Sequence, residues 1–198
     1  MKTTGVVRRI DELGRIVIPK EIRKTLKIKD GESLEIFLED GNIILKKYSH
    51  FDDLKDFYDK FVDSISSSID KTVLITDRCS VIAGAGTLKN NYVTFDISSD
   101  VDRIIEERTN TFSYVKTSFS IVKDRVDAIG YVICPVIVDG DAIGSVIIVS
   151  DSCDLDSFDE RTAILYSKFL SKYIEIWFLL WYNFSQMWWR KVRTILKL

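Results

Sequence analysis

Apolar and polar positions alternate in short runs along the first fifty residues, a pattern typical of β-strands. Gly5–Ile10 and Arg15–Ile18 are two such runs, and Asp11-Glu12-Leu13-Gly14 between them predicts a turn. A brief helix is expected after Pro19, because proline at the first helical position gives up no hydrogen bond. Ser33–Glu39 alternates again, and Asp40-Gly41 predicts a hairpin that returns along 42–47.

Residues 51–70 change to apolar positions three or four residues apart, which predicts an amphipathic helix. The positions are Phe51, Leu54, Tyr58, Phe61 and Ile65. Two arrangements are compatible with this spacing: a short coiled coil, or a helix packed on the domain that follows. Either would make a stiff connection between the flanking regions, since no Gly/Ser-rich linker is present.

Residues 71–176 combine strand and helix patterns, and Gly140-Asp141 between two apolar runs is a hairpin signal. The order is strand, strand, helix, strand, hairpin, helix, which predicts an α+β domain with helices on the faces of an antiparallel sheet. The expected strands are 72–76, 81–83, 112–119, 131–139 and 142–150, and the expected helices are 101–108 and 156–176.

The formal charge of −2 hides a strong asymmetry along the chain. Residues 1–50 carry a net +3, residues 51–176 a net −9, and residues 177–198 a net +4. A basic head on an acidic body indicates a polyanion-binding module joined to a different one. The basic side chains near turns and strand ends, where they can reach phosphates, are Arg8, Arg9, Arg15, Arg23 and Lys24.

The head is too small to be stable alone, because so few apolar side chains bury too little surface to offset chain entropy. We therefore expect an interdigitated homodimer in which two heads share one core. The stretch TGVVRRIDELGRIVIPKEIR, followed by DGESLEIF and IILKKY, resembles the swapped-hairpin DNA-binding domain of the AbrB family of transition-state regulators. The resemblance implies a dimer of interleaved hairpins with Arg8, Arg15 and Arg23 facing double-stranded DNA.

Lys24 stands where members of that family often have another arginine, so the charge is kept but a bidentate guanidinium contact is lost. In the body, the hairpin from Pro135 to Val146 resembles that of a GAF-type sensory domain. The two domains together resemble a family of transcription factors of endospore-forming bacteria, up to about Ile176. That resemblance implies a tetramer, formed through the GAF domains and helices, and a role in sporulation-stage gene expression.

The residue types in this sequence give little support for a catalytic function. His50 is the single histidine, and Cys79, Cys134 and Cys153 are widely spaced, which fits free thiols in a cytoplasmic protein. We expect no catalytic residue, no metal site and no cofactor. Because some GAF proteins are cysteine-based methionine sulfoxide reductases, a thiol enzyme with an accessory head stays as an alternative. A MazE-like antitoxin is another, since related swapped-hairpin domains occur there.

A small-molecule ligand of the GAF-like domain is left open, with Tyr92, Phe95 or Tyr114 able to line a pocket, although core packing is the commoner role of aromatics. The acidic runs at 96–102 and 151–156 invite a calcium interpretation, but they lack EF-hand spacing, which favours a solvated surface.

The tail, residues 177–198, holds all four tryptophans of the chain and four basic residues without any acid. An interfacial membrane anchor would have this composition. An extension produced by frameshift or readthrough, with no selected fold, is the interpretation we favour, so we expect no membrane contact. The sequence thus predicts four regions: a DNA-binding head at 1–50, a linker helix at 51–70, a GAF-like domain at 71–176 and this tail.

Overall fold

The computed structural model describes residues 5–26, 28, 34–47 and 54–196, without the side chains of residues 178 and 180–196. The chain divides into two compact units, Met1–Ser49 and His50–Leu198. Phe51, the first apolar position of the predicted helix, lies outside the described residues.

The N-terminal unit contains one short helix and one hairpin. Helix α1 spans Lys20–Thr25 and follows Pro19, as the sequence predicts. Strands β1 (Leu34–Glu39) and β2 (Asn42–Lys47) pair antiparallel, with Glu39 opposite Asn42 next to the turn. Both turn residues have positive φ, +48° at Asp40 and +76° at Gly41, as the tight turn of a right-twisted hairpin requires. The predicted hairpin is therefore confirmed.

The two runs expected as strands before α1 are not strands in the structure. Gly5–Ile10 and Arg15–Ile18 flank the predicted turn, and two backbone hydrogen bonds close it, from the Asp11 N–H to the Arg15 carbonyl at 3.0 Å and from the Gly14 N–H to the Asp11 carbonyl at 2.9 Å. A strand requires a partner along its length, and the described part of this unit offers none to these runs. The β-type sequence pattern is present without the pairing that would complete it.

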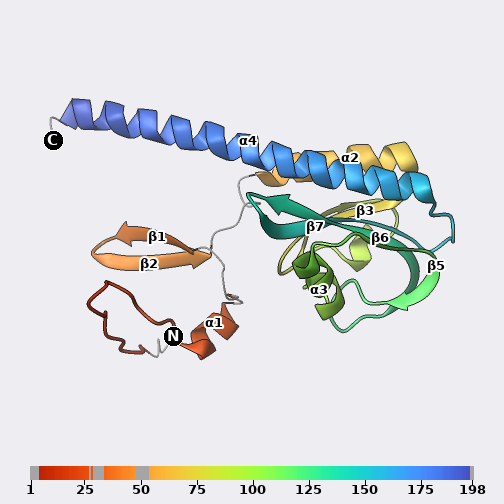
Figure 1. Ribbon diagram of the computed structural model, residues 1–198, viewed down its shortest axis with the longest axis horizontal. Helices are drawn as coiled ribbons and strands as arrows, with labels where there is room; N and C mark the ends of the chain where they lie inside the picture. The colour runs from red at the N-terminus through yellow and green to blue at the C-terminus, as the bar shows by residue number, and fades with distance from the viewer. Residues whose placement is uncertain (1–4, 27, 29–33, 48–53, 197–198) are drawn as a thin grey trace. The chain divides into compact units, whose positions relative to one another are not determined.

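The second unit is built on a five-stranded antiparallel sheet with the order β4-β3-β7-β6-β5 (Figure 1). The long hairpin β6–β7 occupies its centre, and β3 joins β7 in the register Ile75 opposite Val146. The predicted antiparallel α+β architecture is confirmed. The strands are β3 (Thr72–Asp77), β4 (Val81–Ala85), β5 (Thr111–Phe119), β6 (Asp127–Val138) and β7 (Asp141–Ser150).

Helices cover both faces of this sheet. Helix α2 (Lys55–Ile69) and helix α4 (Ser157–Leu196) lie side by side on one face, and α3 (Ser99–Glu107) lies on the other (Figure 1). A 3₁₀ turn at Lys89–Asn91 follows β4. Each face has its own apolar core, and Ile148 and Ile147, neighbours on β7, point into the two different cores. When the side chains of a buried central strand alternate between two cores, its sequence is a continuous run of apolar residues.

The helix predicted over 51–70 packs on the body. Tyr58, Val62 and Ile65 of α2 are buried in the core beneath the sheet, which corresponds to the second of the two arrangements left open by the sequence. The aromatic residues on its flank turn to α4 instead: Phe57 stacks on Tyr173 with ring centroids 4.1 Å apart. Helix α2 is therefore held by both the sheet and α4.

Helix α4 extends much further than the helix expected at 156–176. It continues without a break to Leu196, through the described part of the region predicted as a separate tail, and runs beyond the end of the sheet (Figure 1). Among the residues of α4 whose side chains are described, Ile174 is the last that is fully buried, and Trp177 packs against the same core. Among the described residues, no helix is long and apolar enough to cross a membrane.

We expect Gly144→Ala to destabilise the second unit, because a Cβ at this position of β7 would lie 1.9 Å from the backbone carbonyl oxygen of Thr76. Backbone of a neighbouring strand cannot move aside as a flexible side chain can, so the loss in free energy of unfolding should be about 3 kcal/mol, the upper end for overpacking.

Urea denaturation followed by circular dichroism at one fixed protein concentration measures this loss. Gly140→Ala is the matched control, since nothing lies within 4 Å of its Cβ and only its φ of +89° is unfavourable. Its cost should stay near 1 kcal/mol. Equal costs for the two variants would contradict the steric argument.

Candidate nucleic-acid interface

The five basic residues singled out in the head all belong to the first half of the N-terminal unit. Arg8 and Arg9 precede the turn, Arg15 follows it directly, and Arg23 and Lys24 lie in the last turn of α1. Four of these side chains are exposed, and Arg23 is half-buried. The position of Arg23 and Lys24 at the carboxyl end of α1 is favourable, because cations stabilise the negative end of a helix dipole.

The turn between the two arginine-bearing segments is organised by one carboxylate. Asp11 Oδ1 accepts hydrogen bonds from the backbone N–H groups of Leu13, at 3.0 Å, and Arg15, at 2.8 Å. Its Oδ2 accepts from Arg15 Nε at 2.7 Å. Gly14 completes the turn with a φ of +75°, a conformation that favours glycine. The turn that carries Arg15 is thus closed by side-chain as well as backbone hydrogen bonds.

These contacts affect the ionisation of Asp11. Hydrogen bonds from the backbone N–H and then from the guanidinium of Arg15 lower the pKa of the Asp11 carboxyl below its usual value. Asp11 was not among the candidate residues from the sequence. A signal was available, since an Asp three residues before a Gly is a common way to build a turn in which the carboxylate binds backbone N–H groups.

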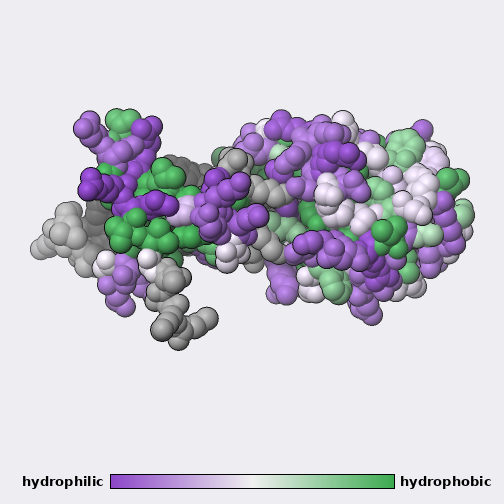
Figure 2. Space-filling view, turned by 90° about the horizontal axis from the view of Figure 1, so that it is seen from below, coloured by the Kyte–Doolittle hydropathy of each residue, from purple (hydrophilic) through white to green (hydrophobic). Residues whose placement is uncertain are grey.

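The hairpin of the same unit carries an apolar surface. Ile36 faces Leu45 across the hairpin and Leu38 faces Ile43, so that the four share one face of the two-stranded sheet. All four are exposed, Leu38 by 82%. Indeed, none of the described residues of this unit is buried. Figure 2 shows such green apolar side chains open to the surface between purple polar ones.

The aromatic residues considered for a ligand pocket in the body do not converge. Tyr92 is buried in the core on the α3 face, where its hydroxyl donates to Asp127 and Arg125 lies over its ring. Tyr114 packs against the opposite core, and its hydroxyl donates to Glu160 of α4. Phe95 is exposed. Burial raises the pKa of the Tyr92 phenol, with the negative charge of Asp127 acting in the same direction.

The three cysteines lie in three different environments. Cys134 is fully buried on β6, and burial raises the pKa of its thiol to about 12. Cys79 is partly exposed in the β3–β4 turn, and Cys153 is exposed in the loop before α4. Because a thiol reacts as the thiolate, the environment of Cys134 opposes nucleophilic chemistry at neutral pH.

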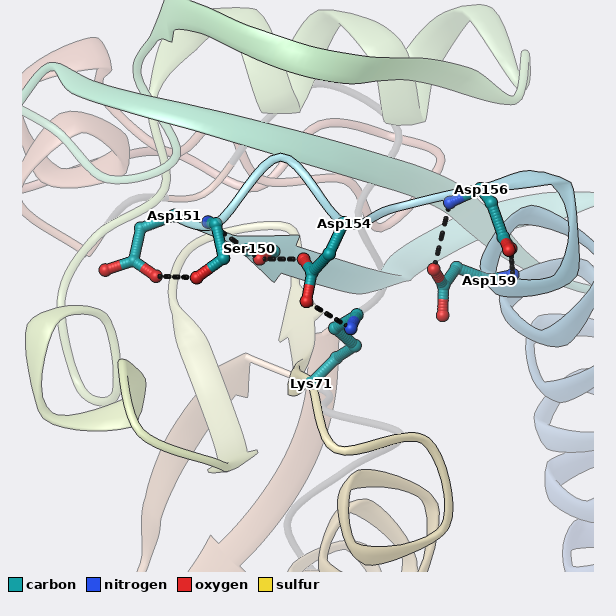
Figure 3. Close-up of polar contacts among 7 residues, drawn as sticks. Lys71, Ser150, Asp151, Asp154, Asp156 and Asp159 are labelled. Atoms are coloured by element: carbon teal, nitrogen blue, oxygen red, sulfur yellow. Dashed lines mark hydrogen bonds and ion pairs between the residues drawn. The ribbon is translucent and has the colours of Figure 1, made fainter.

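The acidic run at 151–156 is used by the fold (Figure 3). Asp154 pairs with Lys71 and accepts the Ser150 hydroxyl, which joins the start of β3 to the loop after β7. Asp156 Oδ1 accepts the N–H of Phe158 at 2.7 Å, and Asp159 Oδ2 accepts the N–H of Asp156 at 3.0 Å. These bonds cap the first turn of α4. In the described part of the chain, no group of three or more His, Cys, Asp or Glu side chains could hold a metal ion.

Comparison with known proteins adds two family matches. Residues 53–175 match the family "Stage V sporulation protein T C-terminal, transcription factor". Residues 7–53 match the family "Antidote-toxin recognition MazE, bacterial antitoxin".

Relatives from Bacillus subtilis (strain 168) were also found. The chain is 39% identical to stage V sporulation protein T over 177 residues, which are 88% of this chain and 99% of that protein. It is 60% identical to the transition state regulatory protein AbrB over 48 residues, which are 24% of this chain and 50% of AbrB.

Solved structures are similar to each unit separately. The solution structure of the N-domain of the transcription factor AbrB is 59% identical, covering 25% of this chain and 94% of that one, with a TM-score of 0.24. The GAF domain of a phosphoenolpyruvate-protein phosphotransferase from Coxiella burnetii is 12% identical, covering 60% of this chain and 80% of that one, with a TM-score of 0.48.

The match to stage V sporulation protein T extends over nearly the full length of that protein and includes both units described above. The matching family model independently covers α2, the five-stranded sheet and most of the packed part of α4. This chain belongs to the stage V sporulation protein T family of transcription factors.

Proposed function

We propose that the protein is a sequence-selective, DNA-binding transcription regulator of sporulation-stage genes. The proposal is carried by the 48-residue match, 60% identical, to the transition state regulatory protein AbrB, together with the family match of residues 7–53, which include the arginine-bearing turn and α1. A solved structure of this part of AbrB, 59% identical to this chain, is described as its DNA recognition domain. Arg8, Arg9, Arg15, Arg23 and Lys24 are the proposed DNA-binding residues.

The proposed binding unit is a homodimer of heads. Ile36, Leu38, Ile43 and Leu45 present an apolar face that one copy of the unit leaves exposed to water. Contiguous apolar surface rimmed by charge marks an interaction site, and a second copy of the same hairpin would bury it by symmetry. The same pairing would offer partner strands to the runs 5–10 and 15–18.

We also propose that the body assembles the chains further, into a tetramer. Its surface for this is a stripe on α4 that faces away from the sheet, with Leu165 63% exposed and Phe169 49% exposed. Phe169 also stacks on Phe61 of α2, so both helices contribute. A small-molecule signal acting through this GAF-like domain is part of the proposal, with its chemistry undefined. The exposed apolar residues of the stripe are Phe158, Leu165, Phe169, Ile176 and Leu179.

The two other functions weighed for this chain receive less support. A MazE-like antitoxin is favoured by the match of residues 7–53, but the family match over the rest of the chain is to a transcription factor. A thiol enzyme would need a reactive cysteine; burial excludes Cys134 from that role and leaves Cys79 and Cys153, and the family match is to a transcription factor. We accordingly propose a non-enzymatic, cytoplasmic protein without a resident cofactor.

DNA binding by the full chain should depend steeply on salt. With four phosphate contacts from each protomer of a dimer, the slope of log affinity against log salt should be about −7, from roughly −0.9 per contact. Fluorescence anisotropy on promoter-length DNA measures it, and Arg8→Ala/Arg15→Ala should weaken binding and flatten the slope. A folded oligomer that binds no DNA at low salt would contradict the proposed function.

Replacing Leu38 by Asn should disrupt the proposed head dimer, because it puts a polar amide in the apolar face. We expect a smaller assembly in sedimentation equilibrium and at least about tenfold weaker DNA binding. Glu39→Asn, at the next position and on the other face of the hairpin, is the control and should leave both properties unchanged. Unchanged assembly mass and affinity in Leu38→Asn would place the dimer contact elsewhere.

Thiol labelling should separate the cysteines. A rise of the Cys134 pKa from 9.0 to about 12 lowers its thiolate population about a thousandfold, and burial slows access further. Brief iodoacetamide treatment of the native protein near pH 8, followed by mass spectrometry, should therefore modify Cys153 and spare Cys134 until urea is added. Equal modification of the two residues in the native protein would contradict the burial of Cys134.

A further inference from the structure

We propose that Asp11 is a positioning residue for DNA recognition: it holds the guanidinium of Arg15 by one edge and leaves the outer edge directed at DNA. The inference rests on the proposed DNA-binding function, and it adds a role for an acidic residue within a surface selected for its positive charge. The two oxygens of the Asp11 carboxylate make different contacts.

The first oxygen maintains the turn. Oδ1 accepts the backbone N–H groups of Leu13 and Arg15, while the Asp11 carbonyl accepts the Gly14 N–H at 2.9 Å. These bonds fix the backbone on both sides of the turn, and with it the point from which the Arg15 side chain departs. A side chain that starts from a fixed backbone has fewer orientations to lose on binding.

The second oxygen restrains the guanidinium itself. Oδ2 accepts from Arg15 Nε at 2.7 Å, a charge-assisted bond on the inner edge of the group. Within the described residues, the N–H groups on Nη1 and Nη2 donate no hydrogen bond, and the Arg15 side chain is 71% exposed. These are the groups that bind a phosphate, or the O6 and N7 atoms of guanine, in a bidentate manner.

The effect of this pair lies in orientation rather than in stability. An exposed ion pair adds little to the free energy of unfolding, because water screens it. A free arginine, however, loses much rotamer entropy when it is fixed on DNA, and a guanidinium already held by Oδ2 has lost part of it before binding. The cost is one negative charge per protomer near the phosphates, which weakens the non-specific attraction.

Two variants can separate the orientation of Arg15 from the effect of removing a negative charge. In Asp11→Asn, the amide oxygen can still accept the two backbone N–H groups, but the amide nitrogen cannot accept from Nε. Glu12→Gln removes the same charge from the neighbouring exposed residue, which takes no part in the three hydrogen bonds to the Asp11 carboxylate. The two variants therefore match in charge and differ in the restraint on Arg15.

The experiment compares full-length variants on an operator selected from a random DNA library and on a scrambled duplex, across a salt series. Asp11→Asn should bind the operator about tenfold more weakly than Glu12→Gln does, with equal affinity for the scrambled duplex and an equal salt slope. In NMR, the Arg15 Nε–H signal should lose its hydrogen-bonded shift in Asp11→Asn, while the amide signals of Leu13 and Arg15 stay in place.

A double substitution completes the test. Arg15→Lys lacks Nε, so adding Asp11→Asn to it should change the operator affinity no more than adding Glu12→Gln does. Identical operator affinities of Asp11→Asn and Glu12→Gln would overturn the positioning role. If Arg15→Ala also binds as wild type, the assignment of Arg15 to the interface fails as well. If the wild-type chain binds no DNA, both the function and the inference are wrong.

Discussion

A single copy of the N-terminal unit exposes more apolar side chains than it can bury, and the organisation of the molecule depends on this constraint. A folded unit of this size normally gains its stability from a core, yet no described residue between 5 and 47 is buried. The face made by Ile36, Leu38, Ile43 and Leu45 is complete in register and open to water. The proposed association of two heads would supply this stability, and it would place the dimer contact and the proposed DNA-binding residues in the same small unit.

The second unit satisfies the opposite condition. Its central strand β7 is buried on both faces, and two separate cores enclose the sheet. Ion pairs such as that of Lys71 with Asp154 connect its loops to its strands. Helix α2 belongs to this unit through Tyr58, Val62 and Ile65, although in sequence it stands next to the head. The part of the chain that follows the N-terminal unit is therefore held in a packed body from Lys55 to Ile174.

Much of this organisation was predictable from patterns that local physics controls. The Asp40-Gly41 hairpin, the helix after Pro19 and the antiparallel sheet all agree with the sequence, because turn residues and strand alternation act over a few neighbours. The strands expected at 5–10 and 15–18 did not form, since strand pairing needs a partner that the pattern cannot supply. The length of α4 was missed because nothing in the change of composition at residue 177 breaks a helix. Asp11 was overlooked because a search for basic side chains does not consider an acidic residue, even one that accepts a hydrogen bond from a neighbouring arginine.

The short stretch between the two units has a consequence for how the heads find each other. Strand β2 ends at Lys47 and helix α2 begins at Lys55, so the intervening 48–54 segment can extend at most about 25 Å. Once two bodies are joined, their heads are confined to a small shared volume, at an effective concentration on the order of millimolar. Heads too weak to pair in dilute solution would pair on this tether. A signal that separated the bodies would lower the effective concentration of the heads. The heads would then release DNA, although no residue that contacts DNA had changed.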